Sequence, residues 1–145
     1  MERKTNWIAV VVSVVATMFI GFLWYGALFQ QQWMAGNGIT MEGEKYFKNG
    51  TEMPMSAMPM VFNTLIMVVY ALVVNWLLQR IGVNTWMEGA KVGAAVGLVV
   101  TLNVIVGNLF ASNPSSLSMV DGSYAFVLFA VLGTILGGWQ KKARE

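Results

Sequence analysis

The chain has 145 residues, of which 57% are hydrophobic and only 11% are charged. Because soluble domains are roughly a quarter charged, this composition excludes an ordinary soluble protein. The chain contains no Cys and no His, which excludes disulfides, thiolate or imidazole metal sites, and Ser-His or Cys-His catalysis. The net charge of +2 comes from basic residues beside apolar segments, so nucleic acid is not a predicted partner.

Four largely uncharged windows are each long enough to cross a bilayer, whose core of ~30 Å requires ~20 helical residues. We therefore expect an all-α integral membrane protein, a single domain over residues 1–145 with four transmembrane helices in an antiparallel bundle. The predicted spans are residues 7–29, 60–78, 90–110 and 124–139, with an outer loop over residues 30–58. The fourth window is short, which predicts an earlier start or little tilt. The loop has room for a short interfacial helix or a hairpin, and the sequence does not choose between them.

The distribution of Lys and Arg predicts the orientation. With the N-terminus in the cytoplasm, seven basic residues lie inside and two, Lys45 and Lys48, lie outside. This bias predicts an inner (plasma) membrane protein with both termini cytoplasmic. The first span lacks a small-x-small cleavage site, so we interpret it as an uncleaved anchor.

Capping signals refine the helix ends. Thr85 and Glu88 have the spacing of a capping box, which starts the third helix. Pro59 suits the first turn of the second helix. Asp121 is expected to cap the fourth helix.

Small residues recur at helical spacing in three of the spans. Such residues let helices approach closely in lipid, where apolar burial gives little driving force. The pattern fits either a homo-oligomeric interface or pore lining, or packing within one four-helix bundle. The candidate packing residues are Ala9, Ser13, Thr17, Gly21, Gly93, Gly97, Gly133 and Gly137.

Four asparagines lie within the second and third spans, and no Asp, Glu, Lys or Arg lies deep in any span. Proton-coupled carriers, sodium-coupled carriers and voltage sensors usually depend on such charges, so these functions are disfavoured. Three of the amides are predicted in the outer half, at the level of two aromatic residues of the first span. They form a candidate pocket or passage for a small neutral solute or ion, unless each amide only bonds a neighbouring helix. The candidate residues are Trp24, Tyr25, Asn63, Asn103 and Asn108.

Four methionines lie just outside the second span, at Met53, Met55, Met58 and Met60. Thioether ligands select Cu(I) or Ag(I), so this segment is a candidate for outer-face copper binding. The alternative is that Met serves here as a flexible filler, as it does elsewhere in the chain. No resident cofactor is predicted.

Segments at the ends of the spans carry a family resemblance. They are Asn6-Trp7, GFLWYG at residues 21–26, Glu88-Gly89-Ala90, Asn108-Leu109-Phe110, Asp121-Gly122 and GTILGGW at residues 133–139. Together they resemble the small bacterial membrane proteins of domain-of-unknown-function family 1761. The resemblance implies a four-helix membrane protein of this length and brings no activity, cofactor or catalytic residue. The methionine segment and the long outer loop do not look like family features.

These patterns lead to one main hypothesis: a non-enzymatic membrane protein that acts through helix packing, as a homo-oligomer or as an accessory subunit of a larger membrane complex. A small passive channel or pocket is the alternative. Outer-face Cu(I) binding is the third. An enzyme is not expected, because no nucleophile and base pair is visible.

Overall fold

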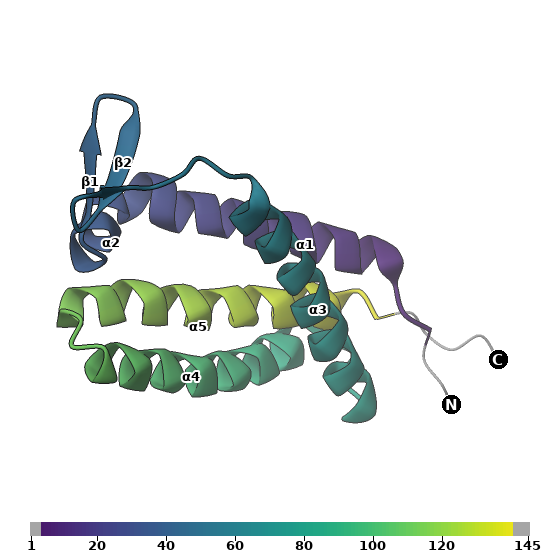
Figure 1. The fold of residues 1–145 in the computed structure, drawn as a ribbon. Helices are drawn as coiled ribbons and strands as arrows, with labels where there is room; N and C mark the ends of the chain where they lie inside the picture. The colour runs from purple at the N-terminus through teal and green to yellow at the C-terminus, as the bar shows by residue number, and fades with distance from the viewer. Residues whose placement is uncertain (1–3, 141–145) are drawn as a thin grey trace.

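The structure is a computed structural model that describes residues 4–140 (Figure 1). Its elements follow in the order α1 (Trp7–Phe22), η1 (Leu23–Leu28), α2 (Gln30–Gly36), β1 (Ile39–Glu42), β2 (Lys45–Lys48), β3 (Thr51–Glu52), α3 (Met58–Arg80), α4 (Trp86–Phe110) and α5 (Ser115–Gly138). Four segments are long and apolar enough to cross a membrane: Trp7–Leu28, Met58–Arg80, Trp86–Phe110 and Ser115–Gly138. The protein is therefore a mostly helical, multi-pass membrane protein, whereas the antiparallel arrangement and the orientation stay predictions.

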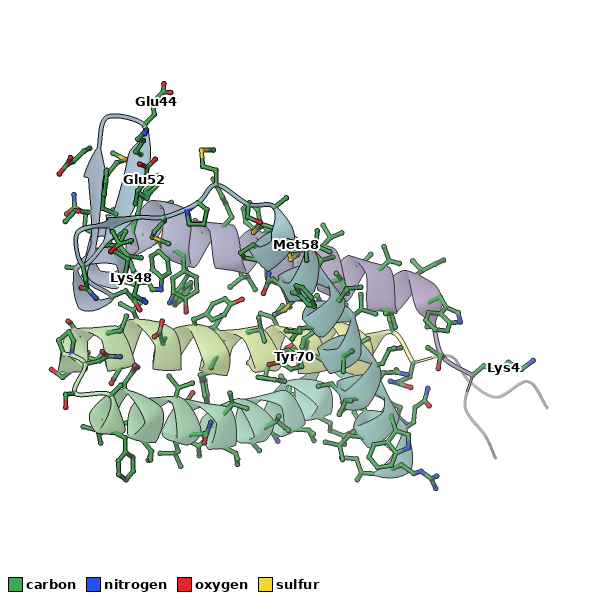
Figure 2. All side chains as sticks on the ribbon, viewed as in Figure 1. Lys4, Glu44, Lys48, Glu52, Met58 and Tyr70 are labelled. Atoms are coloured by element: carbon green, nitrogen blue, oxygen red, sulfur yellow. The ribbon has the colours of Figure 1, made fainter. Side chains whose placement is uncertain are left out.

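Helix α5 is the centre of the structure. It packs against α1, α2, α3 and α4, and in Figure 1 it lies between α1 and α4 while α3 crosses obliquely. The side chains of Leu128, Leu132 and Leu136 are at most 2% exposed, against Ala71, Val74 and Leu78 of the same core. Tyr70 of α3, labelled in Figure 2, stacks at a tilt on Phe129 of α5 with 5.1 Å between ring centroids. Val10 and Val14 of α1 belong to the same core and Val96 of α4 packs against it, so apolar side chains from three helices meet around α5.

Helix α4 packs on α5 through glycines. Gly89, Gly93 and Gly97 are the buried residues of α4, and they recur once per turn. A Cβ atom at Gly93 would meet the carbonyl oxygen of Phe129 and would lie 3.1 Å from the Cα of Gly133. The backbones of α4 and α5 are consequently in direct contact, which no larger residue would permit.

The loop between the first two spans contains both a short helix and strands. Helix α2 is followed by an antiparallel sheet in the order β1-β2-β3. Asn49 and Gly50 both have positive φ, 49° and 82°, as a tight two-residue hairpin requires. The β2–β3 pair also carries an ion pair of 2.9 Å between Lys45 and Glu52, which are exposed.

The helix ends agree with some expectations and correct others. Pro59 lies in the first turn of α3, and the Thr85 hydroxyl accepts a hydrogen bond of 3.2 Å from the backbone N–H of Glu88. Helix α5 begins at Ser115, the early start that its short window predicted. The prediction that Asp121 caps this helix is wrong, because Asp121 lies inside α5. The residues preceding Asp121 stay helical because Leu117 and Val120 are buried against neighbouring elements.

Candidate functional site

The candidate site lies where the first span ends and the chain turns toward the sheet. There the α-helix widens into η1, and the N–H of Phe29 donates 2.9 Å to the carbonyl oxygen of Trp24, five residues back. π-helical turns are rare in proteins. Where a single turn occurs, it often lies at a functional site, because it redirects the neighbouring side chains. Trp24 and Tyr25 both lie in this turn, so η1 sets their directions.

Hydrogen bonds from these two aromatic residues join η1 to α5. The Tyr25 hydroxyl donates to Oδ1 of Asp121 at 2.9 Å. The Trp24 indole N–H donates to the Ser123 hydroxyl at 3.1 Å, and that hydroxyl donates to the carbonyl oxygen of Val120 at 3.0 Å. The polar residues of α5 at this level therefore satisfy the polar tips of the aromatic pair.

The aromatic rings pack as well as bond. Tyr25 makes edge contacts with Tyr124 and Trp33, with 4.9 Å and 5.8 Å between centroids. A Cβ atom at Gly21 would lie 3.3 Å from the hydroxyl oxygen of Tyr124, so the glycine leaves room for that ring. Gly21, Trp24 and Tyr25 of this segment thus contact α5, whereas Phe22 is 70% exposed.

The chemistry available at this site is limited. Asp121 is half-buried and its carboxylate already accepts the Tyr25 hydrogen bond. Within residues 4–140, no group of three or more Asp or Glu side chains comes together to hold a metal ion. The arrangement fixes the end of the first span onto α5, and the titratable groups that it brings together are the Asp121 carboxylate and the phenols of Tyr25 and Tyr124, which already contact one another.

The asparagines predicted to converge have three different environments. The side-chain amide of Asn63 in α3 donates a hydrogen bond of 3.2 Å to the Met18 sulfur of α1. Oδ1 of Asn108 accepts a hydrogen bond of 2.9 Å from the side-chain amide of Asn113, in the turn after α4. Asn103 is exposed on α4 and has no hydrogen-bond partner within the described part of the chain. The structure therefore does not bring these amides together with Trp24 and Tyr25.

The fourth asparagine belongs to the opposite end of the helices. Asn75 is 5% exposed, and its Oδ1 accepts 3.2 Å from the Gln140 amide. At the same end, Nδ2 of Asn6 donates 2.9 Å to the carbonyl oxygen of Trp139, which joins the start of α1 to the end of α5. These bonds are helix-to-helix contacts.

The small-residue stripes lie in contacts inside the chain. Ala9, Ser13 and Thr17 of α1 are at most 1% exposed. A Cβ atom at Gly133 would lie 2.9 Å from the Cα of Gly93, and one at Gly137 would lie 2.7 Å from the Cα of Gly89. Sequence reasoning omitted Gly89 from the packing residues, although it continues the four-residue repeat of Gly93 and Gly97 by one turn.

The methionine segment runs from β3 into the first turn of α3, where Figure 2 labels Met58. Met53, Met55, Met58 and Met60 are all exposed, from 36% for Met53 to 93% for Met55. An open hollow of about 550 Å³ lies between this segment and Tyr46 of β2, with Met53 and Met55 in its lining. The sulfur atoms are accessible, and copper binding there stays a prediction.

The fold and the site define a four-span membrane protein with a π-helical turn at the end of its first span. The family described as "Protein of unknown function (DUF1761)" matches residues 8–137, and the chain belongs to this family. No curated protein and no solved structure matches the chain.

Proposed function

We propose that the protein is a non-enzymatic inner-membrane protein that acts through contacts between helices, as a homo-oligomer or as an accessory subunit of a larger membrane complex. The observation that carries the non-enzymatic part of the proposal is that polar side chains of the spans are already bonded to other segments of the same chain. These bonds are Tyr25 to Asp121, Trp24 to Ser123, Thr101 to the Gly122 carbonyl, Asn63 to Met18 and Asn75 to Gln140.

Such bonds use the polar groups for assembly of the fold rather than for chemistry on a substrate. In hydrocarbon a polar group needs a protein partner, because lipid tails offer none. Thr101 illustrates this: its hydroxyl donates 2.8 Å to the carbonyl oxygen of Gly122 across the α4–α5 contact. A pair of carboxylates for acid-base chemistry is disfavoured, because Glu88 lies in the first turn of α4 and Asp121 lies near the start of α5, at opposite ends of the two packed helices.

The outward surface of α4 supports the same proposal. Apart from its three buried glycines, this helix of 25 residues has large exposed apolar side chains, with Val99 at 68% and Phe110 at 89%. Lipid or another helix must cover such a surface. Because so many apolar side chains of α4 are exposed, this helix is suited to pack against another helix within the membrane.

We also propose that both termini are cytoplasmic. The Asn6–Trp139 hydrogen bond holds the start of the first span beside the end of the last. Among the described residues, three basic side chains lie toward that end, Lys4, Arg80 at the end of α3 and Lys91 near the start of α4, whereas two, Lys45 and Lys48, lie on the sheet at the other (Figure 2). The sheet end is therefore the outer one under the positive-inside rule.

Cross-linking in native membranes, followed by purification, tests the proposal. We expect a cross-linked species larger than the monomer, containing either a second copy or a stoichiometric membrane partner. A monomer alone, purified free of any partner, would contradict the proposal.

A passive channel is the alternative, and flux of small ions and neutral solutes into liposomes holding the purified protein would favour it. The third hypothesis, Cu(I) binding by the methionine segment, is tested by titrating Cu(I) into a peptide of residues 53–60 and into its Met-to-Leu counterpart.

A further inference from the structure

Asn103 is a polar side chain on the face of α4 that points away from the rest of the chain. It lies seven residues before the end of α4, which is ~10 Å along the helix axis at the rise of an α-helix. The side chain is exposed and has no hydrogen-bond partner among residues 4–140. Facing lipid alone, both the donor and the acceptor of this amide would be left unsatisfied, which is strongly unfavourable.

Gly107 lies one helical turn further along the same side of α4. Gly89, Gly93 and Gly97 of this helix are explained by their contact with α5, but Gly107 is exposed and nothing lies within 4 Å of its would-be Cβ in the described structure. Glycine is unfavourable inside a helix unless a close approach requires it. The open space beside Gly107 is therefore space that a neighbouring helix can enter.

The helical period places both residues on one stripe. Val99, Asn103 and Gly107 follow one another at intervals of four, and Val106 flanks them. Asn103 is six residues from Gly97, which faces α5, and this spacing turns it ~120° away. The stripe consequently faces out of the chain, with Val99 68% exposed and Val106 49% exposed.

We propose that this stripe is a homodimer interface, in which α4 packs against α4 of a second copy and the Asn103 side chains of the two copies bond to each other. Copies with the same orientation place Asn103 at the same depth, and an amide is its own complement because it donates and accepts. Gly107 lets the two backbones come close enough for that bond. The inference rests on the proposed function and specifies its partner as a second copy.

Fluorescence energy transfer between copies in liposomes tests the interface. The chain has no Cys, so Glu44→Cys, in the exposed turn between β1 and β2, provides one site for a donor or acceptor dye. We expect transfer that rises with the protein-to-lipid ratio. Asn103→Leu should lower the association constant about three- to thirtyfold, the range for amide bonds between helices in lipid. Asn103→Gln, which keeps the amide, should retain most of the association, and Gly107→Leu should reduce it by blocking close approach.

Leu98→Ala is the matched control, since Leu98 is 50% exposed on the same helix but lies outside the stripe. It should leave transfer unchanged. Transfer that survives both Asn103→Leu and Gly107→Leu would overturn this interface while leaving self-association intact. No transfer from the unmodified sequence at any ratio would overturn both this interface and the homo-oligomer form of the proposed function, leaving only the accessory subunit.

Discussion

Replacing Gly133 by Ala should destabilise the protein by forcing α4 and α5 apart. A Cβ atom there would meet the carbonyl oxygen of Gly89 and would lie 2.9 Å from its carbonyl carbon and 2.9 Å from the Cα of Gly93. Favourable contacts between carbon atoms lie at about 3.5–4.0 Å. Every one of these atoms is backbone, so no side chain can rotate away and the helices must separate by about 0.5–1 Å.

The size of the effect follows from two opposing terms. Overpacking a tight contact costs about 1–3 kcal/mol, and the better helix propensity of Ala returns at most about 1 kcal/mol. We expect Gly133→Ala to lower the free energy of unfolding by about 1–2 kcal/mol on these terms. Gly107→Ala is the control on the same helical hairpin, because its Cβ would meet nothing within 4 Å in the described chain. It should be neutral or stabilising.

Equilibrium unfolding by SDS in mixed micelles, followed by tryptophan fluorescence, measures both variants at a dilution that keeps the protein monomeric. The difference between the two variants should be about 2 kcal/mol, with Gly133→Ala the less stable. If Gly133→Ala is as stable as Gly107→Ala, the backbone contact between α4 and α5 is absent and the packing described here is incorrect.

Three further predictions follow from the hydrogen bonds and the charge distribution. Tyr25→Phe and Asp121→Ala should each cost about 1–2 kcal/mol, and a double-mutant cycle should show coupling because each variant removes the same bond; additive effects would argue against that bond. Thr101→Val should destabilise by about 0.6 kcal/mol, the mean for such bonds between helices, whereas Thr134→Val, which loses only a bond within α5, should cost less; the reverse order would count against the α4–α5 bond. In intact cells, after outer-membrane permeabilisation where an outer membrane is present, Glu44→Cys should react with an impermeant maleimide, and protection until the inner membrane is broken would reverse the orientation.

The spans were predictable because their cause is local. A helix crossing hydrocarbon must be long and uncharged, and both properties are visible in a single window of sequence. The capping role of Thr85 is equally local, since Thr85 and Glu88 are three residues apart. Where the physical reason for a feature lies within a few residues, the sequence carries it.

The contacts of the candidate site were not predictable for the opposite reason. The partner of Asp121 is Tyr25, 96 residues away in the chain, so no local pattern distinguished a cap from an interior hydrogen bond. The asparagines were grouped by depth alone, although depth says nothing about the direction in which a side chain leaves its helix. Asn63 turns toward Met18 while Asn103 turns away from the chain, and only the packing of the helices decides this.

The glycine repeats were recognised, but their partners were not. Gly93 and Gly97 can serve an interface with a second copy or a contact within the chain, because the physical requirement for a small residue is identical in both cases. In the structure they contact α5 within the chain, whereas the space where a Cβ of Gly107 would lie is open among the described residues. Helix α4 is thus divided into an inner stripe that contacts α5 and an outer stripe that carries Asn103.

Disulfide cross-linking of two single-cysteine variants in native membranes tests most directly whether the outer stripe of α4 joins two copies. Val99→Cys and Leu98→Cys lie at adjacent depths on α4, with Val99 in the stripe and Leu98 outside it. Our account predicts a dimer band under mild oxidation for Val99→Cys and little or none for Leu98→Cys. Equal cross-linking of the two variants, or a dimer formed by Leu98→Cys alone, would contradict it.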